Sequence, residues 1–104
     1  MTDEEKTLNS LLNTLGVPVA YMLFREPKPL PFIIYRGAGT FNLEADNVVY
    51  YSRKKYAIEL YYEGKNAELE ETLETLLTEN GYRWTKEEDV YIESERMYMT
   101  VYNI

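Results

Sequence analysis

Two leucine stripes in this sequence have the spacing of α-helices. The first predicts a helix over residues 3–15, which Gly16 ends. The second predicts a helix over residues 66–79, for which Asn66 is the N-terminal cap. The leucines of the first stripe are Leu8, Leu11, Leu12 and Leu15, and those of the second are Leu69, Leu73, Leu76 and Leu77. Each helix therefore presents one apolar face to a core.

The longest stretch with strand character is Asp46–Tyr62. Apolar and aromatic residues of one parity share one face of an extended chain, and they are Val48, Tyr50, Tyr56, Ile58, Leu60 and Tyr62. The opposite parity carries Arg53, Lys55 and Glu59, which favour water, as on the solvated face of an antiparallel sheet. At about 3.3 Å per residue, an unbroken strand here would span roughly 50 Å. We therefore expect a bend, a bulge or a projecting arm near Ser52–Lys55.

Shorter strand signals precede and follow this stretch. Candidate strands are Val17–Phe24 at an edge because of Pro18, Phe32–Arg36, Tyr82–Thr85, and a hairpin of Val90–Ile92 with Met97–Tyr102. Alternating prolines between Arg25 and Pro31 predict a rigid connector, and two glycines predict a loop over residues 37–47. The chain is expected to be one domain over residues 1–104. Its predicted class is α+β, a small mainly antiparallel sheet with two helices packed on one face.

The amino-acid composition limits the kinds of catalytic, metal-binding and nucleic-acid-binding site that this protein can have. The chain has no cysteine and no histidine, which excludes thiol chemistry and removes the commonest general base and metal ligand. A net charge of −7 argues against broad nucleic-acid binding, and no apolar run approaches the ~20 residues of a membrane span. The acidic N-terminus has no signal-peptide pattern, so we expect assembly in a cytoplasm. The eleven tyrosines suit half-buried strands or an interaction surface.

Candidate catalytic constellations are weak. The other faces of the predicted second helix carry five carboxylates, for which we favour a solvated face over a channel lining. They are Glu68, Glu70, Glu71, Glu74 and Glu79. The serines have no histidine to activate them. Stacking of tyrosines on single-stranded bases beside Arg53, Lys54 and Lys55 remains a nucleic-acid alternative. We expect no enzyme activity, no cofactor and no metal site.

From about Leu15 onward the chain resembles the small tail-completion, or head–tail joining, proteins of long-tailed phages and prophages of Gram-positive bacteria. The resemblance rests on the order and spacing of five pieces, which are Gly16–Tyr21, Leu30–Tyr35, Ala45–Tyr50, Ile58–Tyr61 and Tyr91–Met99. The chain departs from the family pattern at Tyr62–Lys65 and in the Gly37–Gly39 loop, which concerns partner specificity more than fold.

The resemblance implies that the protein has a structural role in a virion. Family members form a ring, commonly of six copies, between the head-connector proteins and the tail-tube protein, and they cap or terminate the tail. Such a protein would be assembled in the host cytoplasm and reside at the head–tail interface. The alternative function is a phage-encoded regulatory or inhibitor protein that binds a host protein through its sheet.

Residues in the loops and on the tyrosine faces are the candidate interface. They are Phe41, Leu43, Asp46, Asn47, Arg53, Lys55, Tyr91, Tyr98 and Tyr102. Phe41 and Leu43 either tuck under the loop or dock on a partner, and we expect tucking. We expect the loop over residues 37–47 and the bend near Ser52–Lys55 to form contacts on assembly.

Overall fold

The structure is a computed structural model that describes residues 3–45, 48–64 and 66–104, and the side chains at positions 43–51 lie outside that description. Its elements in chain order are α1 (Asp3–Asn13), β1 (Val19–Tyr21), β2 (Phe32–Ala45), β3 (Val48–Tyr62), α2 (Ala67–Glu79), β4 (Thr85–Lys86), β5 (Val90–Ile92), a 3₁₀ turn (Glu93–Glu95) and β6 (Met97–Asn103). The predicted order of helix, three strands, helix and three short strands is confirmed.

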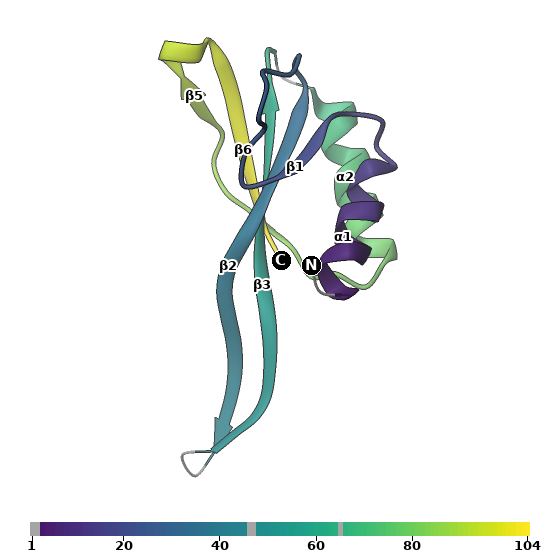
Figure 1. Cartoon of the computed structure of the whole chain (residues 1–104), viewed down its shortest axis with the longest axis vertical. Coiled ribbons are helices and arrows are strands. Elements are labelled where there is room, and N and C mark those ends of the chain that lie inside the picture. Colours follow the sequence, from purple (N-terminus) through teal and green to yellow (C-terminus); the bar gives the residue numbers. More distant parts are fainter. Residues whose placement is uncertain (1–2, 46–47, 65) are drawn as a thin grey trace.

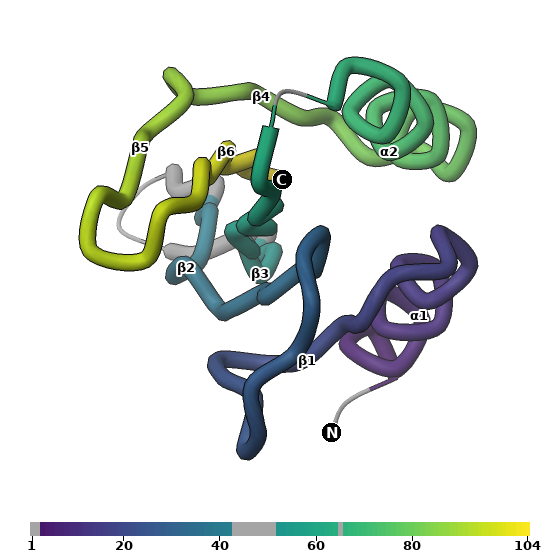
Figure 2. The backbone as a smooth tube through the Cα atoms, turned by 90° about the horizontal axis from the view of Figure 1, so that it is seen from above, coloured from purple at the N-terminus to yellow at the C-terminus, as the bar shows by residue number. Residues whose placement is uncertain are grey.

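One six-stranded sheet holds the molecule together. Its strand order is β1-β2-β3-β6-β4, and β5 pairs with β6 beside β4. β1 runs parallel to β2, and the other pairs are antiparallel. Both helices lie on the same side of this sheet (Figure 2). The predicted α+β class, with two helices on one face of a mainly antiparallel sheet, is confirmed.

The core lies between the helices and the sheet. The alternation predicted for β3 is confirmed at Tyr56, Ile58, Leu60 and Tyr62, which are all buried. The side chains of Val48 and Tyr50 lie outside the description. Two leucines from each helix complete this face, and they are Leu8 and Leu12 from α1 and Leu73 and Leu77 from α2. Each fully buried leucine contributes about 1.5–3 kcal/mol relative to exposure. These contacts bring α1 and α2 onto strands that are distant from them in sequence.

The helix-free face of the sheet is partly covered by aromatic and charged side chains. Phe32 stacks on Tyr61 with ring centroids 5.0 Å apart, and Phe24 meets Phe32 edge-on at 5.3 Å. Arg36 donates to Glu59 at 2.9 Å, and the Tyr61 hydroxyl donates to the same carboxylate at 2.8 Å. Burial and the hydrogen bond to Glu59 raise the pKa of Tyr61 to about 12.

The long hairpin of β2 and β3 projects from the body as an arm (Figure 1). The prediction of a loop over residues 37–47 is wrong for residues 37–45, because β2 continues as a strand to Ala45, and Asp46 and Asn47 lie outside the described residues. The register shifts between Gly37 and Thr40, where Ala38 and Gly39 of β2 lie opposite the single residue Lys55 of β3. Gly39 has a φ of 89°, which suits such a bulge, so the glycines bend a strand rather than end it. The expected bulge and projecting arm are both confirmed.

The segment after α2 is a smaller correction. We expected a strand over Tyr82–Thr85, but the strand begins only at Thr85. The Tyr82 amide donates to the Leu77 carbonyl at 2.9 Å, and the Trp84 indole donates to Thr78 at 3.0 Å. These bonds fasten the segment to the end of α2 and remove it from the sheet.

Candidate functional site

The arm is a two-stranded ribbon over much of its length. β1 pairs with β2 only at Ile33–Tyr35, and β6 pairs with β3 only at Ala57–Tyr62. Beyond these pairings the arm strands pair only with each other among the described residues. A lone two-stranded hairpin is marginally stable in water, and its unpaired edges are templates for another chain. The arm is therefore the strongest candidate for a surface that is completed by a partner.

Two adjoining clefts lie at the base of the arm. They have volumes of about 530 and 300 Å³, and both are lined by Phe41, Arg53 and Arg83. Lys55 and Trp84 also line the smaller cleft, and Glu4 lines the larger one. Phe41 is 50% exposed and pairs with Arg53 across the ribbon. The clefts combine an exposed aromatic ring with three cations, a combination suited to an acidic partner with an apolar side chain.

The cations at the base are concentrated in an acidic protein. Three of the eleven basic residues are consecutive, from Arg53 to Lys55. No ion pair joins Arg53, Lys55 or Arg83 to an acidic side chain within the part of the chain that the structure describes. These charges are thus available to a partner, while other basic residues such as Arg36 and Lys86 already have carboxylate partners.

The structure brings together only some of the predicted interface residues. Phe41, Arg53 and Lys55 meet at the base of the arm. The expected tucking of Phe41 is wrong, because its side chain is 50% exposed and lines the open clefts at the base of the arm. Leu43 belongs to β2, but its side chain lies outside the described residues, as do Asp46 and Asn47 altogether.

The three predicted tyrosines have different surroundings. Tyr91 is 51% exposed and Tyr98 is 37% exposed, and their ring centroids lie 4.9 Å apart at the β5 edge. Tyr102 is fully buried, so its assignment to an interface is wrong. Its parity on β6 directs it toward α2, where its hydroxyl donates to Glu74 at 2.7 Å. Burial, followed by this hydrogen bond, raises the pKa of Tyr102.

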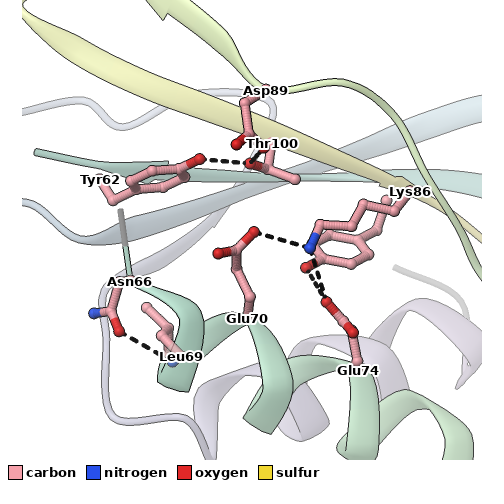
Figure 3. Close-up of polar contacts among 9 residues, drawn as sticks. Tyr62, Asn66, Leu69, Glu70, Glu74, Lys86, Asp89 and Thr100 are labelled. Atoms are coloured by element: carbon pink, nitrogen blue, oxygen red, sulfur yellow. Dashed lines mark hydrogen bonds and ion pairs between the residues drawn. The ribbon is translucent and has the colours of Figure 1, made fainter. Parts of the chain in front are cut away.

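A partly buried charge cluster joins α2 to β4 (Figure 3). Lys86 Nζ lies 3.0 Å from Glu70 and 3.1 Å from Glu74. Glu70 is only 2% exposed, so the predicted solvated face is wrong for this carboxylate, whereas Glu68, Glu71 and Glu79 are exposed as predicted. Burial lowers the pKa of Lys86, but the hydrogen bonds to Glu70 and Glu74 outweigh it and raise the pKa overall. The cluster stabilises the packing of α2 on the sheet.

A second polar chain crosses the sheet near the start of α2 (Figure 3). The Thr100 hydroxyl donates to Asp89 at 2.7 Å and lies 2.8 Å from the Tyr62 hydroxyl. Because Thr100 has a single hydroxyl hydrogen, it accepts from Tyr62. Asn66 accepts from the backbone of Leu69 at 3.1 Å and caps α2, as predicted. These contacts have a structural role, since each polar group forms a hydrogen bond within the fold.

An apolar groove forms another candidate surface on the helix-free side. It has a volume of about 540 Å³ and lies between the connection that follows β1 and the 3₁₀ turn before β6. Leu23, which is 63% exposed, Phe24 and Met97 are among its lining residues. No group of acidic side chains in the described part is arranged to hold a metal ion. None of the described helices has the length and apolar character of a membrane span.

Sequence reasoning missed Arg83 and Trp84 at the base of the arm. They directly follow a predicted helix, and a cation beside an aromatic residue is the only local signal that they give. Their proximity to Phe41 depends on where the arm leaves the sheet, more than forty positions earlier in the chain. No local sequence pattern links residues that are this far apart, so only the tertiary structure shows that Arg83 and Trp84 lie beside Phe41.

Comparison with protein-family models and with curated proteins finds no match for this chain.

Proposed function

We propose that this protein is a structural virion component that completes a phage tail and joins the tail tube to the head connector. The observation that carries the proposal is the arm, a ribbon with unpaired edges that extends from a small α+β body. A monomer gains little from such a ribbon, because it adds exposed backbone without a core. In an assembly, the same ribbon supplies backbone hydrogen bonds and a long contact surface to its neighbours.

The proposed partners are the tail-tube protein, the head-connector protein and further copies of this chain in a ring. The arm base, the β5 edge and the apolar groove give the small body several separate surfaces for them. This number of surfaces suits a joining protein, which contacts neighbours in the ring as well as partners above and below it. The sequence resemblance described above supports the same role.

Deletion of the gene from its phage or prophage tests the proposal. We expect DNA-filled heads beside unattached tails in electron micrographs of the induced lysate, and abnormally long tails would add a role in terminating the tube. The wild-type gene supplied in trans is the control and restores joined particles. Normal infectious particles from the deletion strain would overturn the structural role.

A shortened arm tests the observation that carries the proposal. Thr40 and Lys54 pair in register, so an Asn-Gly turn in place of residues 41–53 closes the hairpin at that pair. The body keeps its core, because every buried core residue that the structure describes lies outside the removed segment. We expect a folded protein by circular dichroism that fails to restore joined particles. Full restoration would show that the arm has no part in joining.

The alternative is a regulatory or inhibitor protein that binds a host protein through its sheet. The apolar groove beside the helix-free face favours it, since Leu23, which lines the groove, is 63% exposed. A normal particle yield from the deletion strain, together with loss of a host phenotype, would favour this function.

A further inference from the structure

We propose that the base of the arm in one copy binds the acidic β5 edge of a second copy. This inference deepens the proposed function and rests on it for its biological setting. The contact would join a cationic aromatic surface to an acidic surface with exposed apolar residues. Each copy carries both surfaces, so one contact type repeats from copy to copy.

The first of the two surfaces is formed by the two adjoining clefts at the base of the arm. Arg53, Lys55 and Arg83 provide the charge, and Phe41 provides an exposed ring between them. The unpaired ribbon edges beside these residues offer backbone groups to an incoming strand. A partner that fits this surface presents carboxylates and an apolar side chain on a strand with a free edge.

The β5 edge of the same protein has that chemistry. β5 pairs with β6 on one side, and no other described strand pairs with it. Val90 and Tyr91 are 45% and 51% exposed on this strand. Acidic residues flank it on both sides, and the exposed ones are Glu87, Glu88, Glu93 and Glu95. Edge strand, exposed apolar residues and negative charge therefore occur together at one place.

A single copy does not satisfy both surfaces by itself. The arm and β5 extend from the sheet in opposite directions along the longest dimension of the molecule (Figure 1), which measures 49 Å against 28 and 25 Å. The contact is therefore between copies and joins two different surfaces. Such a heterologous contact closes into a ring when the rotation between copies closes, and otherwise continues as a filament.

The charges set the conditions for this contact. Both surfaces are exposed, so salt screens their attraction, with a Debye length of about 10 Å at 0.1 M ionic strength. Complementary surface charge chiefly accelerates encounter and selects the partner. We expect self-association to weaken about tenfold or more between 50 mM and 500 mM salt.

Cysteine crosslinking tests the contact directly, because the described chain has no free cysteine and the sequence contains none. One preparation carries Ser52→Cys on the arm, a second carries Glu88→Cys at the β5 edge, and the two are mixed with a short bis-maleimide. We expect a crosslinked dimer of the two variants. The matched control replaces Glu88→Cys with Glu71→Cys, an exposed acidic position on the outer side of α2.

Charge reversal provides the second arm of the test. Arg53→Glu with Lys55→Glu, and separately Glu87→Lys with Glu88→Lys, are each expected to leave monomers in sedimentation velocity at low salt. A mixture of the two variants is expected to restore association, because the unchanged arm base of one variant meets the unchanged β5 edge of the other, and the two reversed surfaces also attract. The control pair Glu68→Lys with Glu71→Lys alters net charge equally and is expected to associate as the wild type does.

Three results would overturn the contact. They are equal crosslinking to Glu71→Cys, failure of the two reversed variants to associate when mixed, and absence of the crosslink from both concentrated protein and purified particles. Particle joining is read separately from these experiments. Unjoined heads in the deletion strain without the crosslink would leave the proposed function standing and remove this contact. A crosslink in concentrated protein, together with normal particles from the deletion strain, would support this contact and remove the proposed function.

Discussion

Removal of Lys86 is expected to destabilise the protein strongly, although its side chain is only partly buried. The change Lys86→Met keeps most of the side-chain length and removes the ammonium group. Glu70, which is 2% exposed, then loses the lysine that lies 3.0 Å from its carboxylate. Glu74 keeps the hydroxyl of Tyr102 as a donor at 2.7 Å. The change therefore removes one ion-pair partner from each of the two carboxylates, and the more deeply buried of the two is Glu70.

The magnitude follows from burial on the two sides of the pair. Removing one partner of a fully buried ion pair costs about 3–5 kcal/mol. The Lys86 side chain is 33% exposed, so water already screens part of the attraction. We therefore expect a loss of about 2 kcal/mol. A change of 1 kcal/mol shifts the midpoint by about 4–8 °C in a domain of this size, which predicts a fall of roughly 8–16 °C.

Thermal and urea unfolding, followed by circular dichroism, measure this loss. Lys6→Met is the matched control, because Lys6 is exposed on α1, and its effect is expected to stay within about 0.5 kcal/mol. The double change Glu70→Leu with Lys86→Met removes both charges and is expected to recover most of the stability. The reasoning fails if Lys86→Met unfolds like the wild type, or if the double variant is no more stable than the single one.

Three further predictions concern pH, the helix cap and the core. The pKa of Lys86 is raised above 10.5 and that of Tyr61 is raised to about 12 from 10.0, so the folded protein holds both protons more tightly than the unfolded chain. Stability present below about pH 10 is therefore expected to fall as pH rises from 10 to 12, and urea unfolding that stays constant over this range would contradict the assignment. Asn66→Ala removes a 3.1 Å cap bond and is expected to cost about 1 kcal/mol, measured by urea unfolding with Asn66→Asp as the control that keeps the cap. Leu77→Ala is expected to cost about 2–5 kcal/mol because Leu77 is fully buried, and an equal cost for the partly exposed Leu76→Ala in thermal unfolding would refute the assigned helix face.

Local patterns in the sequence were sufficient to predict the helices and the inward face of the central strand. Leu8 and Leu12 are buried because helical spacing places them on one side, and a helix is defined by contacts within a few residues. Tyr56, Ile58 and Leu60 follow in the same way from the alternation of a strand. The excess length of this strand also predicted the projecting arm.

The extent of the second long strand was not predictable from its own residues. Gly37 and Gly39 have the composition of a loop, and β2 passes through them because β3 lies alongside to pair with it. Strand pairing is a long-range interaction, so the secondary structure of residues 40–45 depends on a partner strand elsewhere in the chain. For the same reason Phe41 is exposed on a ribbon and does not tuck under a loop.

The sequence by itself determined the two amphipathic helices, the inward face of the central strand, the α+β class and the absence of histidine and cysteine chemistry. Only the tertiary structure decided that Glu70 is buried beside Lys86, that Tyr102 belongs to the core and that Arg83 joins Arg53 at the base of the arm. The physical reason is the range of the interactions involved. Periodicity reports contacts within one element, whereas burial and ion pairing depend on which elements the fold brings together.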